Sequence, residues 1–222
     1  MVDVTLDQIE TLTFDALTKQ GANDRVAKSV AAAVRRAEET GNIICGLYYL
    51  ESYCQQLQTG RVDGTVEPVV TKPRAAAVSV DAKYGFAQPA FDAGFDAAVA
   101  AAKECGVATL AVSNAHTCTS LGYFTEQIAK AGLMGMGYTN AAPAVAAPGG
   151  KSRVIGTNPF AYSVPDGQGG VAVHYDAATT VVARGAITQA EAAGRSIPEG
   201  WAIDNTGAST TDPTAALAAW RL

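Results

Sequence analysis

The chain has 222 residues, of which 48% are hydrophobic, and this is enough apolar surface for one substantial core with at most a smaller satellite domain. Its 16 basic and 21 acidic residues give a net charge of −5 without any run of Lys or Arg. This balance excludes the basic surface that binding to nucleic acid or to an anionic membrane requires, so we expect a small-molecule ligand.

The first part of the chain predicts helices. Thr5 and Gln8 form a capping-box pattern, and the apolar residues that follow recur at helical spacing until Gly21. A second helix is predicted from Asn23 to about Gly41, and a shorter, aromatic one over about 47–57. We therefore expect residues 1–72 to form an N-terminal helical domain.

Strands and helices alternate after a run of turn residues at 60–68. We predict strands over 76–80, 107–112, 134–138, 160–164 and 171–175, helices over about 88–104 and 121–131, and a loop at 141–150. With a boundary near Pro73, residues 73–222 form the second domain. The expected fold class is α/β of the α+β type, in which helices flank a mixed sheet.

The termini and cysteines indicate an intracellular protein. The N-terminus carries neither a basic segment followed by an apolar one nor any apolar stretch near the roughly 20 residues that span a bilayer, so we expect a soluble, cytoplasmic chain without a membrane partner. The four cysteines form no C-x-x-C pair and are interpreted as reduced thiols.

Common catalytic motifs are absent from the sequence. The glycines at 132–137 have the wrong spacing for G-x-G-x-x-G and lead into a predicted strand, which disfavours a Rossmann fold. There is also no P-loop, no G-x-S-x-G elbow and no paired set of metal ligands. Three loops remain as candidate sites.

The first loop, residues 113–124, is rich in small and hydroxyl residues between a predicted strand and a predicted helix. Backbone amides at a helix start, with the Thr119 and Ser120 hydroxyls, suit the pyrophosphate of a cofactor. His116 is a candidate proton carrier because imidazole titrates near neutral pH. The alternative is a helix N-cap beside an exposed histidine, and a metal site at His116 and Cys118 has fewer ligands than zinc needs.

The other two loops are 149–160 and 176–185. In the former, glycines permit tight turns while Thr157 and Asn158 present hydrogen-bonding side chains, although such a segment is also an ordinary turn before a strand. In the latter, Asp176 ends a predicted strand before small and hydroxyl residues. Asp176 can equally be the N-cap of a following helix.

Together these segments resemble the malate/L-lactate dehydrogenase-like family, which includes ureidoglycolate and sulfolactate dehydrogenases and piperideine-2-carboxylate reductases. The resemblance runs in order along nearly the whole chain, and its segments are 46–49, 60–64, 85–89, 155–160 (Ile-Gly-Thr-Asn-Pro-Phe), 197–202 and 210–213. It implies a largely antiparallel, non-Rossmann sheet, a homodimer, and NAD(P)-dependent interconversion of a small 2-oxo or cyclic imino acid with its 2-hydroxy or amino acid. Residues 1–72 would lie on the substrate side, and residues 73–222 would bind the cofactor.

The resemblance also implies where the cofactor, NAD or NADP, is bound. Carried over position by position, the contacts fall on Thr117, Cys118, Thr119, Ser120, Leu121, Thr157, Asp176, Ala177, Ala178, Arg184 and Gly185. The choice between NAD and NADP stays open, because the 2′-phosphate determinant of this fold is not a readable motif.

Two positions depart from the family pattern. Relatives commonly have a proton-donating histidine where this chain has Cys45, and a carboxylate-binding arginine where it has Tyr49. Cys45 is the second catalytic candidate, although a neutral thiol is a poor proton donor and Cys45 can equally be a buried core cysteine. We therefore expect His116 to carry the proton, and His174, inside a predicted strand, to be structural. Tyr49, Lys151 and Arg184 are the expected substrate contacts. The chain also ends where relatives continue with a further segment. The alternative to an active enzyme is a non-catalytic family member that binds a cofactor or ligand without turnover.

Overall fold

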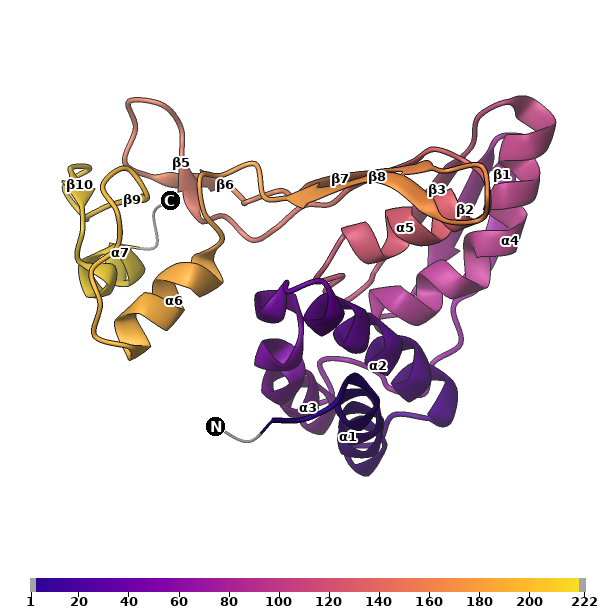
Figure 1. Ribbon diagram of the computed structural model, residues 1–222, viewed down its shortest axis with the longest axis horizontal. Coiled ribbons are helices and arrows are strands. Elements are labelled where there is room, and N and C mark those ends of the chain that lie inside the picture. Colours follow the sequence, from indigo (N-terminus) through magenta and orange to yellow (C-terminus); the bar gives the residue numbers. More distant parts are fainter. Residues whose placement is uncertain (1–2, 220–222) are drawn as a thin grey trace.

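A computed structural model describes residues 3–219, and helices at its N-terminal end form one packed layer (Figure 1). The α-helices are α1 (Leu6–Lys19), α2 (Asp24–Glu39) and α3 (Leu50–Gln58), with two short 3-10 turns at Ile43–Cys45 and Leu47–Tyr49. The predicted capping box at Thr5 and Gln8 is present, and Asn23 caps α2 by accepting from Val26 N. All three predicted helices are confirmed.

The helical layer encloses the largest apolar core. Its buried members are Ile9, Leu17, Ala22, Val26, Ala27, Val30, Val34, Tyr53, Leu57, Val62 and Phe86. Phe86 comes from beyond the predicted domain boundary, and Pro73 itself lies inside a strand, β1 (Val69–Arg74). The boundary at 72/73 stays a prediction.

A small sheet of three strands follows. β1 pairs antiparallel with β2 (Ala77–Asp81), and β2 pairs parallel with β3 (Thr109–Ser113). The long helix α4 (Ala87–Cys105) forms the crossover between β2 and β3, and Gly94 lets it approach the sheet because a side chain there would collide with Val80 and Leu110. α4 ends at Gly106, which adopts the left-handed conformation that favours glycine (φ 81°).

The second sheet is antiparallel, with the order β4 (Gly135–Tyr138), β7 (Phe160–Pro165), β8 (Val171–Ala177). Helix α5 (Gly122–Lys130) packs on one face of it. Ser163 and Thr125 are buried between helix and sheet and share a hydrogen bond of 2.9 Å. The predicted strands and helix in this region are confirmed within a few residues.

The C-terminal part forms a satellite beyond one end of β7 and β8 (Figure 1). It contains β5 (Val145–Ala146), β6 (Arg153–Ile155), α6 (Arg184–Ala192), β9 (Ala202–Ile203), β10 (Ser209–Thr210) and α7 (Pro213–Ala219). α6 and α7 share a small core of their own with Ile187, Ile197 and Ala216. None of these elements was predicted, nor was β1.

The fold class is therefore confirmed: helices flank small sheets that are mixed or antiparallel, and the described residues contain no doubly wound parallel sheet. The mixed sheet is divided into separate small sheets rather than one continuous layer. Within residues 3–219, no helix has the length and apolar composition needed to cross a membrane.

Candidate active site

The turn that carries Cys45 is fixed by a carboxylate from α2. Glu38 Oε1 accepts a hydrogen bond of 2.7 Å from Leu47 N, and it lies so close to Gly46 that a Cβ at that position would collide with it. A side chain at position 46 would therefore displace the Glu38 carboxylate. The turn leads through Tyr49 into α3, so both positions that depart from the family pattern are held by the same short segment.

Aromatic rings connect Tyr49 to His116. Tyr49 stacks on Tyr53 with ring centroids 6.1 Å apart, Tyr53 meets Phe86 at 5.5 Å, and Phe86 meets His116 at 6.3 Å. The Tyr53 side chain is fully buried, and its hydroxyl has no hydrogen-bond partner of acceptable geometry among the described residues, although Thr119 lies nearby. Sequence reasoning missed Tyr53, and its one signal was the four-residue spacing from Tyr49.

His116 is held by the backbone and half-buried, so the alternative of an exposed histidine is wrong. Its N–H donates to Gly85 O (2.8 Å), and its carbonyl accepts from Ala87 N (3.2 Å). Nε2 is buried and has no hydrogen-bond partner in the described chain. Burial, aided by the charge of Arg61, lowers the pKa of the imidazole below 6.5, so its neutral form predominates at pH 7.

The loop after His116 has unusual backbone conformations. Thr117 (φ 25°) and Thr119 (φ 53°) are both in the left-handed region, as is Asn158 (φ 30°) in the second candidate loop. A β-branched residue with positive φ is a genuine outlier and costs of order 1–3 kcal/mol, and such strain concentrates at functional sites. The Cys118 carbonyl is fixed meanwhile by Gln88 Nε2 at 3.3 Å.

Asp176 joins the first loop to the third. Its Oδ2 accepts from Ser120 Oγ at 2.9 Å and from Gly122 N at 2.8 Å. Asp176, which lies in β8 beside the start of α5, therefore caps α5, and the interpretation of it as the N-cap of a following helix is wrong. That helix, α6, begins only at Arg184, after Ala183, and has no side-chain cap.

The second loop contacts the third loop, and the start of α6 contacts the Cys45 turn. Both the N–H and the hydroxyl of Thr179 donate to Thr157 O, each at 2.9 Å, so the segments 157–158 and 176–180 are held together. Gly185 packs against Ile44, where a side chain would collide with it. All three predicted loops thus converge next to the Cys45 turn.

The thiols and phenols of this region are neutral at ordinary pH. Burial, with smaller contributions from the Asp176 carboxylate and Cys118, raises the pKa of Cys45 to about 12. Burial likewise raises the pKa of Cys118. Burial also raises the pKa of Tyr49, whereas Arg184 acts to lower it. Cys45 is therefore a very weak acid, which agrees with the expectation that it is a poor proton donor.

Lys151 lies elsewhere. It lines a hollow of about 540 Å³ with residues 146–150 and the turn at 203–207, in the C-terminal satellite. The described residues contain no group of three His, Cys, Asp or Glu side chains that could hold a metal ion.

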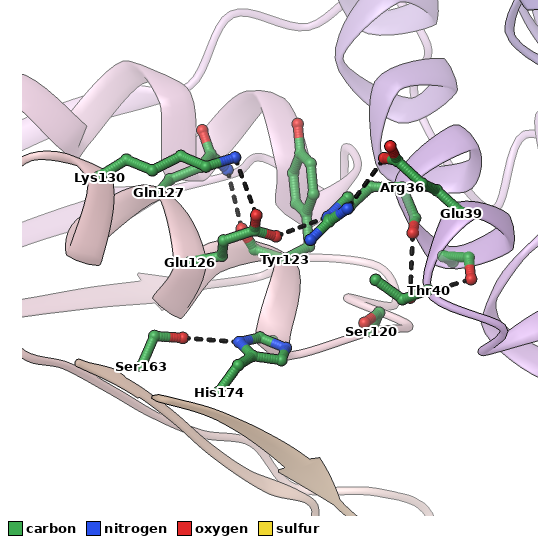
Figure 2. A network of polar contacts seen from close by, with 12 residues as sticks. Arg36, Glu39, Thr40, Ser120, Tyr123, Glu126, Gln127, Lys130, Ser163 and His174 are labelled. Carbon is green, nitrogen blue, oxygen red and sulfur yellow. Dashed lines mark hydrogen bonds and ion pairs between the residues drawn. The ribbon is translucent and has the colours of Figure 1, made fainter. Parts of the chain in front are cut away.

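Two polar networks lie between α2, α5 and the β4-β7-β8 sheet (Figure 2). The buried Glu126 of α5 binds Arg36 of α2 and Lys130, each at 2.8 Å, and so ties the helical layer to α5. Below it, His174 Nδ1 lies 2.8 Å from Ser163 Oγ, which contacts Thr125.

The second network indicates which ring nitrogen of His174 carries a proton. Thr125 Oγ1 lies 3.2 Å from the Gly122 carbonyl, which can only accept. All three contacts are satisfied at once if Thr125 donates to that carbonyl, Ser163 donates to Thr125, and His174 Nδ1 donates to Ser163. His174 Nδ1 then carries a proton, and Nε2 lies beside Gly122.

The chain is similar in sequence to known proteins. The Malate/L-lactate dehydrogenase family matches residues 4–222. The chain belongs to this family. It is 37% identical over 217 residues to a Δ1-pyrroline-2-carboxylate reductase of Ancylobacter novellus, covering 98% of this chain and 63% of that relative. It is 36% identical to a (2R)-3-sulfolactate dehydrogenase (NADP⁺) of Chromohalobacter salexigens, covering 97% of this chain and 64% of that relative.

Solved structures of the family have the same fold as this chain. The Δ1-piperideine-2-carboxylate reductase of Pseudomonas syringae superimposes with a TM-score of 0.92 at 32% identity, covering 98% of this chain and 65% of that one. A sulfolactate dehydrogenase of Methanocaldococcus jannaschii gives 0.83 at 30% identity, covering 96% and 62%. The chain thus spans less than two thirds of the length of these relatives.

Proposed function

We propose that the protein is an NAD(P)-dependent oxidoreductase that interconverts a small 2-oxo or cyclic imino acid with the corresponding 2-hydroxy or amino acid. The observation that carries this proposal is the convergence of three loops, distant in sequence, on the Cys45 turn, with Asp176 bonded to Ser120 and Gly122. Relatives named as reductases of cyclic imino acids support the substrate class.

The residues of the converging loops fit a dinucleotide. The unpartnered Tyr53 hydroxyl and His116 Nε2 border the strained loop at 117–119, and unsatisfied buried groups of this kind call for a functional explanation. Segments 117–121, 157, 176–178 and 184–185 would hold the cofactor, mostly through backbone groups. When bound, the cofactor supplies or receives the hydride, and the protein must orient the substrate and move a proton.

His116 would move this proton. Because its pKa is lowered, the neutral imidazole is available at pH 7 to accept a proton during oxidation. The protonated form, which reduction needs, is correspondingly scarcer than for an ordinary histidine at the same pH. Cys45 cannot replace it, since burial raises the thiol pKa to about 12. Tyr49 and Arg184 would contact the substrate, and Lys151 is a weaker candidate because it lies in the satellite.

The first experiment is a fluorescence titration of the purified chain with NADH and NADPH, followed by turnover with 2-oxo acids and cyclic imines. Binding with turnover supports the proposal, whereas binding alone supports the alternative of a non-catalytic family member, which the Cys45 and Tyr49 positions favour. If the chain shows no binding and no turnover, the proposal is contradicted for this chain. We also propose that the protein is cytoplasmic and that it forms a homodimer. Light scattering of the purified chain tests the dimer.

The proton role has its own test. His116→Asn should abolish most oxidation at pH 7 and flatten the pH–rate profile, while Cys45→Ala, a matched change at the family's histidine position, should leave the shape of the profile intact. An active His116→Asn variant with an unchanged profile would exclude His116 as the proton carrier.

A further inference from the structure

The start of helix α4 is joined to the loop that follows β3. The helix begins without a side-chain cap. Instead, Ala87 N donates to the carbonyl of His116 at 3.2 Å, and the side-chain amide of Gln88 donates to the carbonyl of Cys118 at 3.3 Å. The next residue, Pro89, has no N–H, so the second bond comes from a side chain and not from the backbone.

These two bonds fix the direction of two backbone N–H groups. A trans peptide unit is planar, and its C=O and N–H point in opposite directions. The carbonyls of His116 and Cys118 both point to the start of α4. The N–H groups of the same peptide units, those of Thr117 and Thr119, therefore point away from α4. Neither of them donates to a backbone carbonyl of residues 3–219, so both are left as donors on that side of the loop.

Gln88 makes this contact at a cost to stability. The residue is only 1% exposed. Because the Cys118 carbonyl can only accept, the amide nitrogen of Gln88 must face that carbonyl and the amide oxygen must face elsewhere. This oxygen, Oε1, is buried and has no hydrogen-bond partner among the described residues. A buried acceptor without a partner lowers stability, so stability alone does not explain a glutamine at this position.

We propose that Gln88 is a positioning residue of the candidate active site. Its buried amide holds the Cys118 carbonyl, and so keeps the N–H of Thr119, together with that of Thr117, oriented for an anionic group of the ligand. Backbone N–H groups that gather in a loop with left-handed residues suit a phosphate or pyrophosphate. The inference rests on the proposed function, because the anion assigned to these N–H groups is the pyrophosphate of NAD or NADP.

Gln88→Met tests the proposal, because it keeps the size of the side chain while it removes both the donor and the unpartnered acceptor. We expect the dissociation constants of NADH and NADPH to rise about tenfold. The melting temperature should stay the same or rise, since a buried acceptor without a partner is lost. In the ligand-free chain, backbone ¹⁵N relaxation should show larger motions at residues 117–119. A residue with only a structural role would lower the melting temperature and leave affinity unchanged.

Gln56→Met is the matched control. Gln56 also has a buried Oε1 without a partner in the described chain, but its Nε2 donates to Ser52 Oγ within α3 and not to the loop. It should change neither cofactor affinity nor motion at 117–119. Unchanged affinity or unchanged relaxation in Gln88→Met overturns the proposal.

Inorganic pyrophosphate separates this inference from the proposed function. It should shift the amide signals of Thr117 and Thr119 in the unmodified chain, and do so more weakly in Gln88→Met. If NADH and NADPH do not bind but pyrophosphate gives this result, the proposed function fails and the role of Gln88 stands. If pyrophosphate shifts neither amide signal, or shifts both equally in the two proteins, the positioning role is overturned.

Discussion

The helical layer and the candidate active site are stabilised in opposite ways. The helices α1 to α3 enclose a continuous apolar core in which Leu17, Val30 and Tyr53 are completely buried. The converging loops have few such contacts, and polar ties from Asp176 and Thr179 hold them while Thr117 and Thr119 keep strained backbone angles. Stability should therefore depend mainly on the helices, and ligand affinity on the loops.

The largest expected effect tests the helical side of this comparison. Leu17→Ala should lower the free energy of unfolding by about 2–5 kcal/mol, because a fully buried side chain leaves a cavity. Below the unfolding transition, cofactor affinity should be unchanged. Leu12→Ala is the matched control in the same helix, since Leu12 is exposed, and chemical denaturation measures both. Equal effects of the two changes would contradict the assigned core.

A second prediction concerns the ion pair that joins the two regions. Glu126→Gln should lower the free energy of unfolding at pH 7 by about 1.5–3 kcal/mol, because it removes charged hydrogen bonds from Arg36 and Lys130. Glu39→Gln, which removes an exposed partner of Arg35 and Arg36, should cost much less.

The same pair predicts a pH dependence. Burial acts to raise the pKa of Glu126, but Arg36 and Lys130 outweigh it, so the folded pKa is lowered from 4.5. A lowered pKa means that the stabilisation is complete above 4.5 and is lost as the pH falls through the folded value. The difference between the native chain and Glu126→Gln should shrink in acid. A difference that grows below pH 4.5 would contradict the sign of this shift.

A third prediction tests the loops. Asp176→Ala should lower the free energy of unfolding by only about 1 kcal/mol but weaken NADH or NADPH binding roughly tenfold, because it releases Ser120 and the start of α5. Asp166→Ala is the matched control: this carboxylate likewise accepts two hydrogen bonds, both from backbone amides, but at the hairpin between β7 and β8. If both variants bind the cofactor equally, the tie at Asp176 has no role in binding.

The sequence predicted the helical side better because its signals are local. The capping box at Thr5 and the N-cap at Asn23 each lie within a few residues of the atoms they bind. Asp176 shows the limit, since its partners lie 54 and 56 residues away and the nearer interpretation, a cap of its own helix, was wrong. β1 was missed because its residues are exposed and include Pro73, and α6 because it lacks a side-chain cap.

The smallest effect is the most specific, because its sign should reverse between the two regions. Thr119 pays about 1–2 kcal/mol for its left-handed conformation (φ 53°), whereas glycine adopts it freely at an entropic cost of about 0.5–1 kcal/mol. Thr119→Gly should therefore raise the free energy of unfolding by up to about 1 kcal/mol. The same change at Thr11, inside α1, should lower it by about 0.3–0.5 kcal/mol. Cofactor affinity should fall only for Thr119→Gly, because the loosened loop must be ordered on binding. A loss of stability in both variants would show that Thr119 is not strained, and the contrast between a relaxed helical layer and a strained site would then fail at its most sensitive residue.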